Sequence, residues 1–337
     1  MPPTPPPDND ETDHRGPGAA QPGCGDHCRC PRGRQMSDLD TLLATPGFAG
    51  SLLGSDISSV TGRMPALDQV VGVTVAGPVL MNDVGIHDTP VPMGGPIRCR
   101  PGQITLRLNP ARLGMALVTE PAAHVPPTLR LFDSDGNTAH ATYLTEHSDR
   151  LAFESLTLRS GDEEADTPPL PDPELGALPG LSGTPEIHAN DQVAQFDSIL
   201  DDGGALRRAT FGSGTGEATR VEMRRVISAF EHVALLGMPV TTAAAAPGCL
   251  QMRHHRLDGA REHRGSMVIA SGNCRTMINF NLVADCWVTW SDGVWGRTGS
   301  MELYDRHGRC SFVATQTGAV EASSHTAWHQ LMCDLVG

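Results

Sequence analysis

The sequence contains no lysine, so each of its 25 basic residues is an arginine, against 39 acidic residues and a net charge of −14. Without lysine the chain has no amine for a Schiff base and no lysine for a phosphate-binding loop. Arginine is therefore the one fixed cation available for a bound carboxylate, and its planar guanidinium suits bidentate pairing. The acidic balance disfavours nucleic acid or an anionic lipid surface as the main partner.

Long apolar runs are also missing. No stretch of about 18 apolar residues occurs, and the first residues are polar and rich in proline, so we expect no membrane insertion. The nine cysteines are odd in number and scattered, without a secretory segment, which predicts reduced thiols and a cytoplasmic protein. The residue patterns of hydrolases, zinc proteases and nucleotide-binding proteins are absent, so nothing supports a hydrolase or a kinase.

What is present is a long internal repeat. The stretch Leu129–Leu156 predicts a strand, a turn at Asp133–Gly136, a second strand and a short amphipathic helix. Its apolar-x-Leu-aromatic-Asp-x-x-Gly unit returns as Met301–Gly308, at an offset of 172 residues. Self-similarity at one long offset predicts a duplicated domain.

Composition divides the chain into four parts. Residues 1–38 lack the apolar density of a core and are expected to be a disordered tail, and residues 160–184 are an acidic, proline-rich linker. Residues 39–159 and 185–337 are the two repeats. Their short strands and tight turns predict an α+β fold of two tandem homologous repeats, each a large antiparallel sheet packed with helices. Helices are expected near 39–43, 66–70, 148–156, 191–200 and 222–236.

The tail carries a compact cluster of soft metal ligands, Cys24, His27, Cys28 and Cys30. A zinc or iron site would require four such ligands on a folded scaffold. The alternative, which we favour, is a flexible tail with incidental cysteines.

With both repeats laid out, the sequence resembles the HemS/HmuS/ChuS family of bacterial cytoplasmic haemin-trafficking and haemin-degrading proteins. In repeat one the resemblance rests on Asn82–Asp88, Leu131–His140, Tyr143–Asp149 and Ala152–Glu154. In repeat two it rests on Gly237–Val240, Pro247–Gln251 and Leu303–Gly308. The likeness covers residues 60–156 well and 190–335 in patches.

The resemblance implies two pseudo-symmetric halves, with haem in a cleft of the second half. A histidine on a helix would hold the iron, and arginines would lie near the propionates. Such a site needs an imidazole nitrogen, an apolar slot and cations for two carboxylates. Family members are described either as carriers to a haem oxygenase or as haem-degrading enzymes, and the resemblance does not choose between these roles. The implied partners are haem, a haem transporter or haem oxygenase, and an electron donor.

The family's axial histidine opens the first helix of repeat two, and the position that aligns with it here is Ala194. A methyl group cannot ligate iron. His188, six residues upstream, is a substitute, although it lies about one and two-thirds helical turns away. His254 and His255 offer a second imidazole pair.

The remaining candidates each have a structural alternative. His87 is an iron or propionate partner on the family pattern, or else a histidine bonded to its strand end. Arg107 alternates with apolar neighbours, so it is a carboxylate clamp if its face lines the cleft and otherwise, as we favour, a solvated strand residue. Arg253 serves a propionate or is an edge charge. Because His254 and His255 are adjacent in a strand, at most one of them faces a pocket.

Two functions follow from these observations. The first is a cytoplasmic haem-binding protein in haem uptake and iron acquisition, which carries haem and whose capacity to degrade it is left open. The second is a non-catalytic scaffold or regulatory protein that keeps the duplicated fold without haem, and Ala194 is the feature that favours it.

Overall fold

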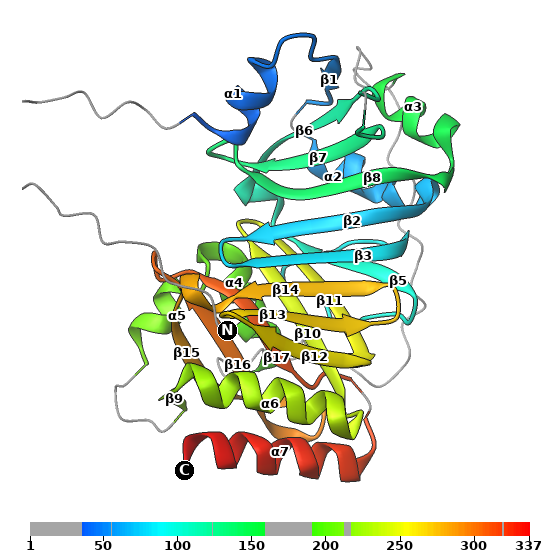
Figure 1. The fold of residues 1–337 in the computed structure, drawn as a ribbon. Helices are drawn as coiled ribbons and strands as arrows, with labels where there is room; N and C mark the ends of the chain where they lie inside the picture. Colours follow the sequence, from blue (N-terminus) through cyan, green and yellow to red (C-terminus); the bar gives the residue numbers. More distant parts are fainter. Residues whose placement is uncertain (1–35, 55, 123, 159–190, 212–216, 319) are drawn as a thin grey trace, which may run out of the picture. The chain divides into compact units, whose positions relative to one another are not determined.

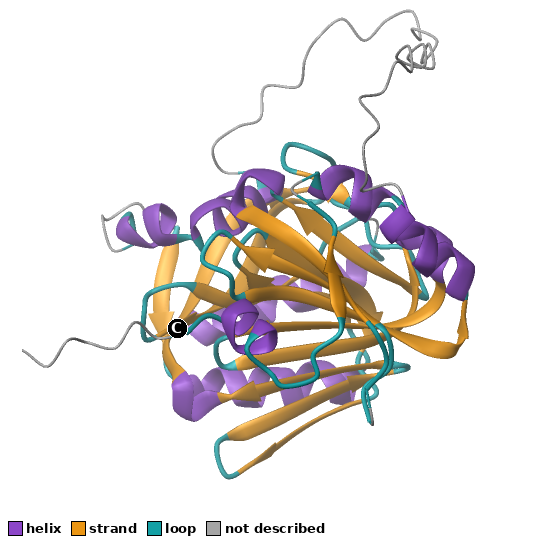
Figure 2. Ribbon diagram, turned by 90° about the horizontal axis from the view of Figure 1, so that it is seen from above, coloured by secondary structure: helices purple, strands orange, loops and turns teal. Residues whose placement is uncertain are grey.

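The computed structural model describes residues 36–54, 56–122, 124–158, 191–211, 217–318 and 320–337. These residues belong to one compact unit that runs from Met36 to Gly337. Strands occupy the middle of this unit and helices lie along their margins (Figure 2). The α+β class predicted from the sequence is confirmed.

Most strands of repeat one lie in a first sheet, which we call sheet A (Figure 1). Its neighbouring strands are antiparallel along the whole order. In spatial order they are β1 (Gly50–Leu52), β6 (Leu113–Thr119), β7 (Thr128–Asp133), β8 (Thr138–Ser148), β2 (Asp68–Ala76), β3 (Val79–His87), β14 (Cys274–Asn279), β13 (Ser266–Ser271) and β12 (Gly259–His263).

Most strands of repeat two lie in a second sheet, sheet B. Its pairings are antiparallel except at the edge strand β4, which runs parallel to its neighbour. In spatial order the strands are β4 (Val91–Pro92), β5 (Gln103–Leu108), β11 (Cys249–Arg256), β10 (Pro239–Ala246), β17 (Cys310–Thr315), β16 (Gly296–Asp305), β15 (Val283–Gly293) and β9 (Ala218–Val221).

The two repeats exchange strands. β14 of repeat two pairs with β3 in sheet A, and β5 of repeat one pairs with β11 in sheet B. These two exchanged strands occupy equivalent places in their repeats. Buried side chains from both sheets, among them Met81 of β3 and Phe312 of β17, belong to one apolar cluster. The halves are therefore joined by backbone hydrogen bonds and a shared core.

Helices complete each repeat in the same order. In repeat one α2 and α3 supply Ile57 and Leu156 to the core, and in repeat two α6 and α7 supply Phe230 and Trp328. The helices and short 3-10 turns are α1 (Asp38–Leu43), α2 (Ile57–Gly62), η1 (Met64–Leu67), η2 (Pro110–Arg112), α3 (Arg150–Leu158), α4 (Gln192–Asp202), α5 (Ala205–Ala209), α6 (Met223–Leu236), η3 (Phe280–Leu282) and α7 (Ala322–Val336).

Two equivalent turns show the duplication at atomic detail. The Oδ1 atom of Asp133 accepts the backbone N–H groups of the residues two and four positions later, at 2.9 and 2.8 Å. Asp305, 172 residues further on, makes the same two bonds at 2.8 and 2.9 Å. Gly136 and Gly308 close the turns with φ of 82° and 77°, a region that favours glycine. The predicted tandem repeat is confirmed, whereas the domain boundaries themselves stay predictions.

The helix expected near 66–70 was placed wrongly. The chain forms η1 at Met64–Leu67 and then enters β2 at Asp68, while the helix of this region lies earlier, at Ile57–Gly62. Asp56 caps that helix by accepting the N–H of Ser59 at 3.1 Å. The capping residue, and not apolar spacing, was the signal that could have located it.

Candidate functional site

Helix α4 covers one face of sheet B, and this face is the candidate site. Strand register places its side chains in rows across the sheet. One row contains Arg107, Leu250 and Ala245, and the next contains Thr105, Met252, Ala243, Val313, Glu302 and Trp287. A third row contains His254, Thr241, Thr315, Ser300 and Thr289.

The local sequence sets the bounds of α4. Asp191 is its N-cap and accepts the N–H of Val193 at 3.2 Å, and Gly203 ends it in the left-handed conformation with φ of 71°. Phe196 and Leu200 are buried against the apolar residues of the rows on sheet B. The amphipathic helix predicted at 191–200 is therefore confirmed, and its apolar stripe fixes it over this face.

A buried ion pair lies on the flank of α4 that carries Ala194. Asp197, one turn after Ala194, accepts hydrogen bonds from Nε and Nη2 of Arg107 at 2.7 and 2.5 Å. The third guanidinium nitrogen of Arg107 donates to the carbonyl of Gly95 at 2.9 Å. Arg107 is 1% exposed, so the favoured prediction of a solvated strand residue is wrong. Its guanidinium clamps a carboxylate of its own chain.

We expect Arg107→Met to lower the free energy of unfolding by about 3 kcal/mol, because Asp197 then keeps a largely buried charge without its cation. Arg112→Met is the matched control, since Arg112 pairs with Asp201 on the same helix flank but both side chains are nearly half exposed. That loss should stay below about 1 kcal/mol. Urea denaturation measures both, and equal losses would contradict the assignment.

The other flank of α4 covers a buried carboxylate. Glu302 is 0% exposed, and its Oε1 accepts Gln195 Nε2 and Thr289 Oγ1, both at 2.6 Å. Arg207 of α5 donates to the same oxygen at 3.2 Å, and Tyr304 donates its hydroxyl to Oε2 at 2.6 Å. Burial and the neighbouring Glu302 charge raise the pKa of Tyr304 far above its ordinary value, so it remains a phenol.

His254 is the predicted imidazole that lies on this face. Its Nδ1 is 2.9 Å from Thr241 Oγ1, which in turn lies 2.7 Å from Thr317 Oγ1. Thr241 pairs in register with Thr315, which accepts a bond from Gln192 at the start of α4. Burial and the charge of Arg256 lower the pKa of His254, which favours the neutral ring.

The protonation state of His254 suits metal ligation. The tautomer that donates from Nδ1 to Thr241 leaves the lone pair of Nε2 for a metal. No hydrogen bond engages Nε2 within the described ranges. The structure thus presents one neutral, oriented imidazole beside the N-terminal end of α4.

Three other candidates point to the opposite side, between the sheets. Arg253 pairs with buried Asp83 of β3, and His255 Nε2 bonds Thr242 Oγ1 at 3.0 Å. His254 and His255 therefore do face opposite sides of β11, as their adjacency predicts. Arg253 is no edge charge, because it is largely buried between β11 and β3.

His87 also points between the sheets. It is 1% exposed, its Nε2 lies 3.0 Å from Thr142 Oγ1, and its ring meets that of His140 edge-on with centroids 5.6 Å apart. The structure therefore does not bring His87, Arg253 or His255 to the face that α4 covers.

His188 and the cluster of Cys24, His27, Cys28 and Cys30 lie outside the described residues. Within the described ranges, no group of three or more histidine, cysteine, aspartate or glutamate side chains is arranged to hold a metal ion. Burial raises the pKa of the thiols of Cys249 and Cys274 to about 12, so both stay protonated. They act as small core residues, as their positions on strands predict.

Sequence reasoning missed Asp197, Arg207 and Glu302. Glu302 carried a usable signal, because it is the one charged residue inside the apolar strand Ser300–Tyr304 and thus had to be paired or exposed. Asp197 and Arg207 lie in polar stretches, where nothing in the spacing marks a buried partner. Among the described helices none is long and apolar enough to cross a membrane.

Comparison with solved structures finds the same fold. The heme degrading enzyme ChuS of Escherichia coli O157:H7 superposes with a TM-score of 0.67 and 15% identity over 90% of this chain and 91% of that chain. Apo-PhuS, a heme-binding protein from Pseudomonas aeruginosa, gives 0.63 and 16% over 88% and 89%. No family model and no curated protein matches the sequence. The chain therefore has a HemS/ChuS-like fold along most of its length.

Proposed function

We propose that this protein binds haem on the face of sheet B beneath α4, and that it serves as a cytoplasmic haem carrier in haem uptake and iron acquisition. The fold likeness to heme-binding and heme-degrading proteins supports the ligand. The observation that carries the proposal is His254, a neutral imidazole held through Nδ1 with its Nε2 unengaged.

Residues of the chain fit the parts of such a site. His254 would ligate the iron through Nε2, and Thr241 would orient the ring. Met252 and Ala243 supply apolar surface on the same face. Arg107 would hold a propionate only if Asp197 were displaced, which is costly for a buried pair.

Better cations for the propionates lie beside His254. The Cys99 thiol bonds the backbone of His254 and the side chain of Thr105, which places the surrounding loop along this face. Arg98 and Arg100 flank Cys99, and their side chains are 42% and 59% exposed. Their contacts with Asp88 are loose, at 4.0 and 3.4 Å, so both can turn to a carboxylate at little cost.

Bound haem would supply the iron chemistry that trafficking or degradation requires, and the chain would supply ligation and an apolar wall. The buried phenol of Tyr304 donates to Glu302 and holds no mobile proton for catalysis. Carriage of haem is therefore the role that the described residues favour over degradation.

Titration with hemin tests the proposal. We expect a saturable, shifted Soret band for the wild type that His254→Ala abolishes. His263→Ala, an exposed histidine on β12, is the matched control and should leave the band unchanged. His188→Ala is measured beside them, because a loss there and not in His254→Ala would assign the iron to His188. The absence of a shifted band in the wild type would refute haem binding and favour the scaffold that Ala194 suggests.

Ala194→His places an imidazole at the position of the family's axial ligand. Ala194 is half-buried on the flank of α4 that holds Asp197, so a longer side chain there projects toward the same face of sheet B. We expect hemin affinity to rise at least about tenfold, as one added iron–imidazole bond allows. Titration of this variant against the wild type measures the change, and an unchanged affinity would contradict the alignment of α4 with the family's helix.

A further inference from the structure

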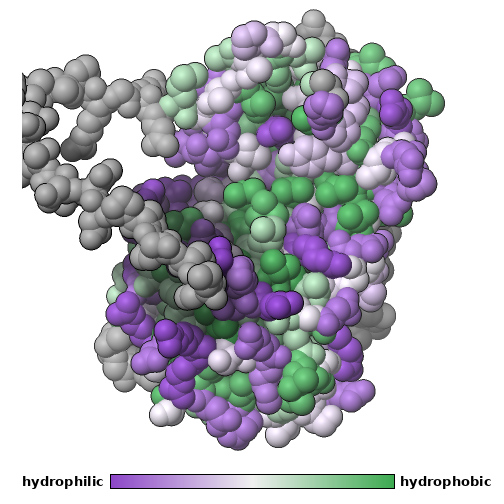
Figure 3. All heavy atoms as spheres, viewed as in Figure 1, coloured by the Kyte–Doolittle hydropathy of each residue, from purple (hydrophilic) through white to green (hydrophobic). Residues whose placement is uncertain are grey.

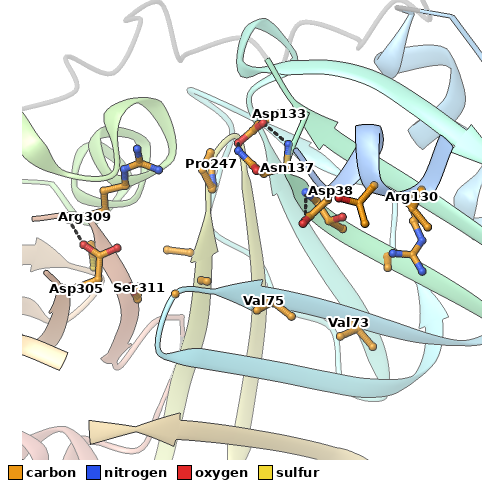
Figure 4. A pocket seen from close by; sticks show the side chains of 18 of the residues that line it. Asp38, Val73, Val75, Arg130, Asp133, Asn137, Pro247, Asp305, Arg309 and Ser311 are labelled. Atoms are coloured by element: carbon orange, nitrogen blue, oxygen red, sulfur yellow. Dashed lines mark hydrogen bonds between the residues drawn. The ribbon is translucent and has the colours of Figure 1, made fainter. Parts of the chain in front are cut away.

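A pocket of about 540 Å³ lies away from α4, where the outer face of sheet A meets the turns of both repeats. Val73 and Val75 of β2 form its floor, Arg130 of β7 and Asp38 of α1 lie on one side, and Arg309 lies on the other (Figure 4). The space-filling view shows the surface hollowed beside an apolar band over β2 and β3 (Figure 3). None of the candidates discussed above lines this pocket.

The duplication relates this pocket to the site beneath α4. Arg130 lies 172 residues before Glu302, and each faces the equivalent partner strand, Ala141 for Arg130 and Val313 for Glu302. The outer face of sheet A is thus the counterpart of the face that α4 covers. Repeat two has a buried carboxylate at this position, and repeat one has a cation.

The two equivalent residues differ in their partners. Glu302 has its charge matched by Arg207 and its oxygens filled by hydrogen bonds. Arg130 has no hydrogen bond or ion pair to any described residue, and its Nε is buried without a partner. Its guanidinium lies over the Tyr143 ring, 5.9 Å from the centroid, which leaves the edges of the fork toward the pocket. An unpaired, half-buried guanidinium is costly unless something binds it.

The carboxylates around the pocket are engaged elsewhere. Asp133 and Asp305 accept the backbone N–H groups of their own turns, and Asp38 accepts the N–H of Thr138 at 2.9 Å. Arg309, at the opposite side of the floor, is exposed and has no ion pair among the described residues. The pocket therefore combines an apolar floor with uncompensated positive charge.

We propose that this pocket binds an organic carboxylate with an apolar body. The carboxylate takes the fork of Arg130 in a bidentate pair, the same pairing that Arg207 and Glu302 make within repeat two. The apolar body lies on Val73, Val75 and Ala76. The proposal does not depend on haem binding, because the two faces belong to different sheets.

Calorimetric titration with decanoate tests the proposal on the full chain. We expect saturable binding that 1-decanol, which has the same chain and no charge, weakens at least about tenfold. Acetate, which has the charge and no apolar body, should not bind at the same concentrations. These two comparisons use the unaltered protein, so they hold whatever a substitution does to folding.

Arg130→Met should weaken decanoate at least about tenfold and leave the Soret titration with hemin unchanged. Arg261→Met, an exposed arginine of β12 outside the pocket, is the matched control and should bind decanoate as the wild type does. The proposal is overturned if decanoate shows no saturable binding, if 1-decanol or acetate binds equally well, or if Arg130→Met binds decanoate undiminished. A failed hemin titration would leave these results standing.

Discussion

Lowering the pH from 7 to 5 should destabilise this protein by about 4–6 kcal/mol through its buried histidines. Burial lowers the pKa of His87 and of His255 to about 3, and the charge of Arg253 adds to the effect on His255. His140 is shifted in the same direction by burial and by His87. In the unfolded chain each of these groups titrates near its ordinary pKa of about 6.5.

The sign follows from proton uptake. Between pH 6.5 and about 3 the unfolded chain binds protons that the folded chain refuses, so stability is complete above pH 6.5 and falls as the pH drops. Each histidine contributes about 2 kcal/mol between pH 7 and pH 5.

Urea denaturation at pH 7, 6 and 5 measures this loss. His255→Gln should reduce it by about 2 kcal/mol, because the amide can bond Thr242 without titrating. His147→Gln, an exposed histidine, is the control and should change nothing. A free energy of unfolding that is flat between pH 7 and pH 5 would contradict the burial of these three rings.

Glu302→Ala should lower the free energy of unfolding by about 3–5 kcal/mol. The substitution leaves Arg207 without its counter-ion, and it leaves the donors of Gln195 and Tyr304 without their acceptor beneath α4. A buried donor that loses its acceptor costs the full desolvation of that group.

Two variants calibrate the Glu302 result. Glu302→Gln retains one carbonyl oxygen and should lose less than Glu302→Ala. Glu231→Ala, on the exposed side of α6, should stay within about 0.5 kcal/mol of the wild type. A loss below about 1 kcal/mol for Glu302→Ala would mean that the carboxylate is hydrated and that α4 does not seal this face.

The internal repeat was predictable because local chemistry encodes it. The apolar alternation and the Asp-x-x-Gly turn at Asp133 and Asp305 depend on neighbours within four residues, and both turns form as expected. The strand exchange was not predictable, because an antiparallel pairing such as β5 with β11 leaves no mark in the periodicity of either strand.

The site followed the same division. Alternation predicted that His254 and His255 separate to opposite faces, and their threonine partners confirm it. The burial of Arg107 escaped prediction because its partner, Asp197, lies 90 residues away and approaches only when α4 packs on the sheet. Sequence spacing identifies a strand's faces, and tertiary packing decides which of them is covered.

The central claim is that the face beneath α4 binds haem through His254, and a crystal structure of the hemin complex tests it most directly. The account predicts iron bonded to Nε2 of His254, Thr241 still at Nδ1, and propionates toward Arg98 and Arg100. Iron bound to another side chain, or haem on a different surface with His254 unaltered, would contradict it.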